Sequence, residues 1–184
     1  MWPLHFRMPI INPFQLLGLP IAFDLDEAAL RRAFLAKVLA IHPDLANADD
    51  SQGQSADLNH ARELLSNPES RGNILLALLG GPTKEADKSL PPAFLMEIME
   101  TREAIETALA SGNPEERARW SDWGIKQRQT YVTQVRDMFA ALGTTPSESA
   151  LKHIRTMLNA WRYIERLIEQ LDPAYDPNRA DFKN

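Results

Sequence analysis

The sequence predicts an all-α protein in which an N-terminal helical hairpin is followed by a C-terminal three-helix bundle. Strand signals are nearly absent, because no stretch alternates β-branched and polar residues and no Asn-Gly pair marks a hairpin turn. Residues typical of helix starts and stops recur along the chain, with apolar residues at three- and four-residue steps between them. The last three helical stretches are the longest and have short connections, which is typical of a bundle.

Composition narrows the class of protein. The chain has 184 residues, 44% of them hydrophobic, and a net charge of −5, which suits a globular protein and argues against a cationic nucleic-acid binder. The absence of cysteine excludes disulfides, thiolate zinc sites and thiol catalysis. No apolar run reaches the roughly 18 residues that a membrane span needs, and no secretory signal is recognisable. We therefore expect a cytoplasmic protein that binds neither membranes nor nucleic acid.

The first two helices are marked by their starts and stops. Asn12 is the expected N-cap of a short helix that has Pro13 at its first position and ends at Gly18. The next helix, LDEAALRRAFLAKVLAI, begins after Asp24 or Asp26. Its apolar residues recur at helical spacing and form one face: Leu30, Phe34, Val38 and Ile41.

Two more helices complete the N-terminal half. A polar loop, LANADDSQGQ, is expected before the helix SADLNHARELLS, which ends at Asn67–Pro68. That helix places Leu58, Ala61 and Leu65 on one side, where they can pack against the preceding helix. A short, strongly apolar helix, ESRGNILLALLGG, follows and is closed by two glycines.

Residues 80–91 change in character, and they divide the chain into two halves. This segment combines glycine, proline and alternating charges without periodicity, so we expect a linker between a domain of residues 10–79 and a bundle of residues 92–172. The bundle helices are expected at residues 93–110, from Asn113–Pro114 to Leu142, and from TPSES to Leu171. The last helix has a long apolar stripe: Leu151, Ile154, Leu158, Trp161, Leu167 and Leu171. The tail, residues 173–184, is expected to be disordered.

The tripeptide His42-Pro43-Asp44 directly follows the second helix. Proline disfavours the α region for the residue before it, so the helix should end near His42. An imidazole and a carboxylate are then presented on a stiff loop. The same three residues are also compatible with a simple helix end that has two solvated polar side chains and no binding role.

The surrounding residues make this tripeptide informative. A short helix, a basic and apolar helix, an HPD loop and an antiparallel partner helix resemble a J-domain. The segments NPFQLLGLP, LRRAFLAKVLAIHPD, ADLNHARELLSNP and, in the second half, FLMEIMETREAIE resemble the HscB/Jac1 family of J-domain co-chaperones for iron–sulfur cluster assembly. The resemblance implies a co-chaperone rather than an enzyme, one that stimulates ATP hydrolysis by a DnaK/HscA-type chaperone and delivers an IscU-type scaffold protein to it.

The resemblance also implies two sets of binding residues. The chaperone-binding set is His42, Pro43 and Asp44 with Arg31 and Arg32. The scaffold-binding set is Leu95, Met96, Met99, Glu100, Glu103 and Tyr163. From spacing alone, the apolar members of the second set would more often be core positions of a bundle. Phe94 and Ile98 are expected to face the core, because one helix cannot expose every apolar residue that it holds.

The sequence is also compatible with two alternatives. The chain could be a J-domain co-chaperone with a different client protein. It could also be a metal-dependent hydrolase with His42, Asp44 and His60 as ligands, although three nitrogen and oxygen ligands without a fourth candidate make a poor zinc site. Since no glycine-rich phosphate loop or nucleophile motif occurs, we expect no catalytic site, metal or cofactor.

Overall fold

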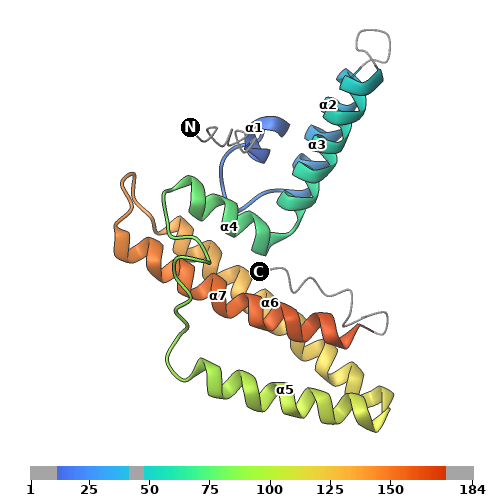
Figure 1. Cartoon of the computed structure of the whole chain (residues 1–184), viewed down its shortest axis with the longest axis vertical. Helices are drawn as coiled ribbons and strands as arrows, with labels where there is room; N and C mark the ends of the chain where they lie inside the picture. Colours follow the sequence, from blue (N-terminus) through green and yellow to red (C-terminus); the bar gives the residue numbers. More distant parts are fainter. Residues whose placement is uncertain (1–11, 42–47, 173–184) are drawn as a thin grey trace, which may run out of the picture. The chain divides into compact units, whose positions relative to one another are not determined.

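The structure, a computed structural model, describes residues 12–41 and 48–172, and of residues 48–52 it describes the backbone alone. Within these ranges it contains seven helices and no strand, so the all-α prediction is confirmed (Figure 1). None of the helices in this part of the chain is long and apolar enough to cross a membrane. The residues form two compact units, one ending at Arg71 and the other beginning at Gly72.

The first two helices begin and end as their caps predict. In α1 (Pro13–Leu17) the side chain of Asn12 accepts a hydrogen bond from the Phe14 N–H at 3.0 Å, and Gly18 ends the helix at a φ of 71°. In α2 (Glu27–Ala40) the N-cap is Asp26, whose carboxylate accepts from the N–H groups of the second and third residues at 3.1 Å each. These local hydrogen bonds satisfy donors that a helix N-terminus otherwise leaves unpaired.

Helix α3 (Ala48–Ser66) lies beside α2 and completes the predicted hairpin (Figure 1). The loop expected over residues 45–54 is wrong from Ala48 onward, where the backbone is already helical. A polar stretch is also compatible with a solvent-exposed helix, and the single glycine there, Gly53, costs a helix only about 1 kcal/mol. Leu58, Ala61 and Leu65, the three residues predicted for one side of α3, are all buried. The other buried apolar residues of this unit include Phe14, Leu17, Phe23 and Leu30.

A buried arginine joins the C-terminal end of α3 to the segment before α2. The Arg71 guanidinium donates through Nη1 to the carbonyl of Leu65 and lies 5.3 Å from the ring centroid of Phe23. Burial lowers the pKa of Arg71, and the nearby carboxylates of Asp24 and Glu27 act in the opposite direction. Its long aliphatic stem and its charged head therefore both take part in packing.

Helix α4 (Pro68–Leu78) begins in the first unit and ends in the second, where the chain continues into three long helices. These are α5 (Phe94–Ser111), α6 (Pro114–Ala140) and α7 (Glu148–Leu171), which pack side by side as the predicted bundle (Figure 1). The end of α6 comes two residues before the predicted Leu142, within the usual uncertainty of helix ends. All six residues of the predicted α7 stripe are buried.

The segment between α4 and α5 is hydrogen-bonded to α7. The side chain of Asn159 donates to the carbonyls of Asp87 and Ser89 at 3.0 Å each. Near it, the buried Arg155 of α7 donates to the side chain of Asn73 in α4 at 2.7 Å. Residues 80–91 therefore belong to the second unit, while the domain limits of 10–79 and 92–172 stay a prediction. The tail, residues 173–184, lies outside the described residues.

Candidate functional site

Three large apolar side chains of α5 point away from the bundle core. Leu95, Met96 and Met99 are 53%, 69% and 63% exposed, whereas Phe94 and Ile98 are 8% and 7% exposed. The interpretation of the first three as core positions is therefore wrong, and the prediction that Phe94 and Ile98 face the core is confirmed. Isolated exposed apolar residues are common on protein surfaces, but three within two turns of one helix form a patch.

The start and end of α5 hold this surface in place. The helix follows two prolines and begins after Ala93, which has a φ of 63° and makes no side-chain cap. The left-handed conformation is uncommon for a residue other than glycine and costs of order 1 kcal/mol, so the chain direction at this point is imposed by the surrounding structure. At the other end Gly112, with a φ of 66°, closes the helix.

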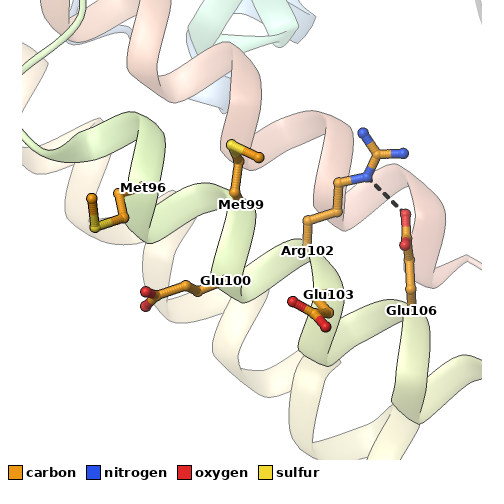
Figure 2. Close-up of a pocket in the computed structure, with 6 residues that line it drawn as sticks. All are labelled: Met96, Met99, Glu100, Arg102, Glu103 and Glu106. Carbon is orange, nitrogen blue, oxygen red and sulfur yellow. Dashed lines mark hydrogen bonds and ion pairs between the residues drawn. The ribbon is translucent and has the colours of Figure 1, made fainter.

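An open pocket on the outer side of α5 extends this patch toward the C-terminal end of the helix. Figure 2 shows its lining residues spread along the helix: Met96, Met99, Glu100, Arg102, Glu103 and Glu106. The Nε of Arg102 donates to Glu106 at 2.7 Å, so the pocket's cation is already paired with one of its three carboxylates (Figure 2). The surface is apolar in its first half and negative in its second.

We call Leu95, Met96, Met99, Glu100 and Glu103 the α5 face. Flexible thioethers adapt to irregular partner surfaces, and a rim of carboxylates favours a partner with positive charge beside an apolar spot. Such a face is suited to binding another protein. Sequence reasoning missed Arg102 and Glu106, although their separation of four residues is the spacing of a helical ion pair.

Tyr163 of α7 lies against the first turn of α5. Its ring meets the ring of Phe94 edge to face, with the centroids 5.9 Å apart, and the side chain is 37% exposed. The structure therefore brings the predicted residue of α7 beside the helix that carries the α5 face. Phe94 and Tyr163 belong to different helices and are 69 residues apart in the sequence, so only the folded bundle brings them into contact.

The chaperone-binding residues are placed in part. Arg31 and Arg32 are exposed on α2, and the guanidinium of Arg32 lies 3.6 Å from the carboxylate of Asp26, which caps the same helix. Helix α2 ends at Ala40, so the predicted helix stop before His42 is confirmed. The tripeptide itself, His42, Pro43 and Asp44, lies outside the described residues.

The hydrolase alternative has no assembled site in the described part of the chain. Among residues 12–41 and 53–172, no three histidine, aspartate or glutamate side chains are close enough together to hold a metal ion. His60 is exposed on α3. The other two residues of that alternative, His42 and Asp44, lie outside this part.

Comparisons with known proteins connect both halves of the chain to one family. Residues 90–172 match the family model described as the HSCB C-terminal oligomerisation domain. A co-chaperone protein HscB homolog of Vibrio cholerae serotype O1 is 31% identical over 169 residues, which cover 88% of this chain and 99% of that protein. The mitochondrial J-type co-chaperone jac1 of Schizosaccharomyces pombe is 31% identical over 153 residues, or 81% of this chain and 65% of that protein.

Solved structures show the same likeness. Chaperone HscB from Vibrio cholerae matches with a TM-score of 0.69 and 28% identity, covering 88% of this chain and 95% of that one. Human co-chaperone protein HscB matches with a TM-score of 0.70, covering 89% of this chain and 81% of that one, and at 22% identity this shows a common fold alone. With such coverage, the matches extend over both the hairpin and the bundle.

Proposed function

The chain belongs to the HscB/Jac1 family of co-chaperones, and from that premise we propose that it delivers an IscU-type scaffold protein to a DnaK/HscA-type chaperone during iron–sulfur cluster assembly. In this proposal the bundle binds the scaffold through the α5 face and Tyr163, and the hairpin binds the chaperone. The exposure of Leu95, Met96 and Met99 carries the proposal, because a bundle helix gains nothing in stability by placing its apolar residues in water.

The mechanism needs two binding surfaces on one chain. The hairpin, through His42, Pro43 and Asp44 with Arg31 and Arg32, favours the arrangement of the chaperone that hydrolyses ATP, which is an allosteric coupling between two proteins. Because proline restricts the backbone φ at position 43, we expect less conformational entropy to be lost when the tripeptide binds. The tethered scaffold reaches an effective concentration of around a millimolar at the chaperone if the geometry permits. The co-chaperone makes and breaks no covalent bond in either step.

The scaffold contact is tested by truncating the two apolar side chains that lie one above the other on α5. Leu95→Ala with Met99→Ala should weaken binding of the IscU-type scaffold about tenfold or more, because buried apolar anchors supply most of an interface's free energy. Isothermal titration calorimetry measures the affinity. The circular dichroism spectrum should not change, since both side chains are more than half exposed.

The matched control is Ile125→Ala, which truncates a side chain that is 61% exposed on α6. It should leave the affinity as it is. If the double α5 variant binds the scaffold as tightly as the wild-type chain, the α5 face does not contact the scaffold. If the wild-type chain stimulates the chaperone but does not bind the scaffold, the client is a different protein.

The chaperone contact is tested by Asp44→Asn. This change removes a charge that can accept charge-assisted hydrogen bonds from a basic group of the partner, so we expect it to abolish stimulation of the chaperone's ATP hydrolysis. A steady-state ATPase titration measures the effect. The scaffold affinity and the circular dichroism spectrum should stay at their wild-type values, and equal stimulation by the variant would remove the role of the tripeptide.

A further inference from the structure

The two methionines of the α5 face are the most exposed thioethers in the described part of the chain. Met96 and Met99 lie mostly in water, whereas Met138 of α6 and Met157 of α7 are half-buried. The chain has no cysteine, so no thiol of its own competes with these thioethers for an oxidant. An oxidant that arrives through the solvent therefore reaches Met96 and Met99 before the methionines of the bundle interior.

Both sulfur atoms are accessible from the same open pocket. Met96 and Met99 line the pocket on the outer side of α5, and Figure 2 shows each side chain projecting from the helix. Their separation of three residues makes them neighbours on the helix surface. A small peroxide can thus reach either sulfur without a movement of the bundle.

The reaction available to these sulfurs is the transfer of one oxygen atom. Hydrogen peroxide donates an oxygen to the thioether: the O–O bond breaks, an S–O bond forms, and the second oxygen leaves as water. The sulfur is oxidised by two electrons, and the peroxide is reduced by two. The product is a polar sulfoxide, which methionine sulfoxide reductases convert back to the thioether with electrons from two thiols. The modification is therefore reversible.

Sulfoxides would change the α5 face where the proposed contact is apolar. They would leave Leu95 as the apolar side chain of the face, beside the carboxylates of Glu100 and Glu103. A sulfoxide oxygen that enters an apolar spot of a partner without a hydrogen-bond donor costs free energy. The bundle core does not depend on either sulfur, because both side chains are more than half exposed. Oxidation therefore alters the binding surface and not the fold.

We propose that oxidation of Met96 and Met99 to sulfoxides by a peroxide is a reversible modification that releases the scaffold protein from the α5 face. This inference rests on the proposed function and specifies how its scaffold contact is regulated. A bound scaffold in turn covers the two sulfurs and slows their oxidation. Oxidation and scaffold binding thus oppose each other at the same atoms.

The test treats the full-length chain with hydrogen peroxide, removes the peroxide, and measures scaffold affinity by isothermal titration calorimetry. Peptide mass spectrometry follows sulfoxide formation, which should occur at Met96 and Met99 before Met138 and Met157. The affinity should fall about tenfold or more, because two apolar anchors become polar. Sulfoxide reductases with dithiothreitol should restore the affinity. The same peroxide treatment in the presence of bound scaffold should oxidise Met96 and Met99 more slowly.

Two leucine variants serve as matched controls, since leucine and methionine have similar volumes. Met96→Leu with Met99→Leu removes the exposed sulfurs, so its affinity should be the same before and after peroxide, whatever its starting value. Met138→Leu with Met157→Leu retains the exposed sulfurs, so peroxide should lower its affinity as it does for the wild-type chain.

The outcomes separate this inference from the proposed function. Unchanged affinity of a wild-type chain that is oxidised at both Met96 and Met99 would overturn the inference and leave the proposed function intact. An equal loss of affinity in the Met96→Leu, Met99→Leu chain would do the same, because other groups would then be responsible. Faster oxidation of Met138 and Met157 would also overturn the inference. If the untreated wild-type chain does not bind the scaffold, both the proposed function and the inference are wrong.

Discussion

Glu165 of α7 is the centre of a polar contact between α6 and α7. Its carboxylate accepts hydrogen bonds from both Nε and Nη2 of Arg128, the first at 2.8 Å, and from the indole N–H of Trp161 at 2.8 Å. The Glu165 side chain is 12% exposed, so water competes little for these bonds. The hydrogen bonds to Glu165 raise the pKa of Arg128, which keeps the guanidinium charged. A forked pair of this kind fixes the relative rotation of two helices as well as their distance.

At this scale we predict that Glu165→Gln lowers the free energy of unfolding by about 1–2 kcal/mol, because a charge-assisted forked pair is replaced by a weaker neutral one. Chemical denaturation followed by tryptophan fluorescence measures the change. The matched control is Glu106→Gln, which breaks an exposed ion pair within α5 and should cost less than about 0.5 kcal/mol. Equal effects of the two changes would show that the burial of Glu165 contributes nothing.

Helices α6 and α7 approach closely at a glycine. A Cβ on Gly124 would lie 2.8 Å from Cγ1 of Ile168, closer than two carbon atoms can pack without displacement. Glycine inside a helix is about 1 kcal/mol less favourable than alanine, so helix propensity does not explain its presence in α6. The close packing of Ile168 does. The absence of a side chain lets α7 pack directly on the backbone of α6.

For these helices we predict that Gly124→Val destabilises the second unit by about 2–3 kcal/mol, since the added methyl groups must push Ile168 out of its position. Thermal unfolding followed by circular dichroism measures the loss. Gly53→Ala is the control, because Gly53 lies inside α3 with no neighbouring atom within 4 Å of an added Cβ. It should stabilise the first unit by about 0.5–1 kcal/mol through helix propensity. If Gly124→Val unfolds at the same temperature as the wild-type chain, α6 and α7 can move apart at this point without a loss of stability.

The molecule as a whole consists of two units that each have a core. Leu65 is fully buried in the first unit and Leu158 is fully buried in the second. In the proposed function these cores support different binding surfaces, the hairpin for the chaperone and the bundle for the scaffold. Damage to one core should therefore affect one of the two activities first.

For the whole molecule we predict that two equivalent truncations reduce different activities. Each should cost about 3 kcal/mol of the stability of its own unit. Leu65→Ala should reduce stimulation of the chaperone while scaffold affinity stays near its wild-type value. Leu158→Ala should reduce scaffold affinity. The stimulation of the chaperone that is measured without scaffold should stay near its wild-type value. Paired ATPase and calorimetric titrations distinguish these outcomes, and loss of both activities in both variants would mean that the units unfold together.

The sequence by itself determined the helices and most of their ends. Asn12, Asp26, Asn113 and Ser147 cap their helices through hydrogen bonds to backbone N–H groups two or three residues away, so the signal lies within one turn. The buried stripe of α7 was predictable for a similar reason, since 3.6-residue periodicity reports which side of a helix is apolar. The start of α3 was not, because a polar stretch fits both a loop and an exposed helix.

Spacing alone favoured core positions for Leu95, Met96 and Met99, and only the tertiary structure decided that these three side chains face water. Phe94 and Leu95 are adjacent and both apolar, yet one is 8% and the other 53% exposed, because α5 turns a single side toward α6 and α7. The contact of Tyr163 with Phe94 and the burial of Arg71 likewise depend on residues that are distant or unpatterned in sequence. Caps and periodicity are properties of a few consecutive residues, whereas burial depends on what the rest of the chain places beside them.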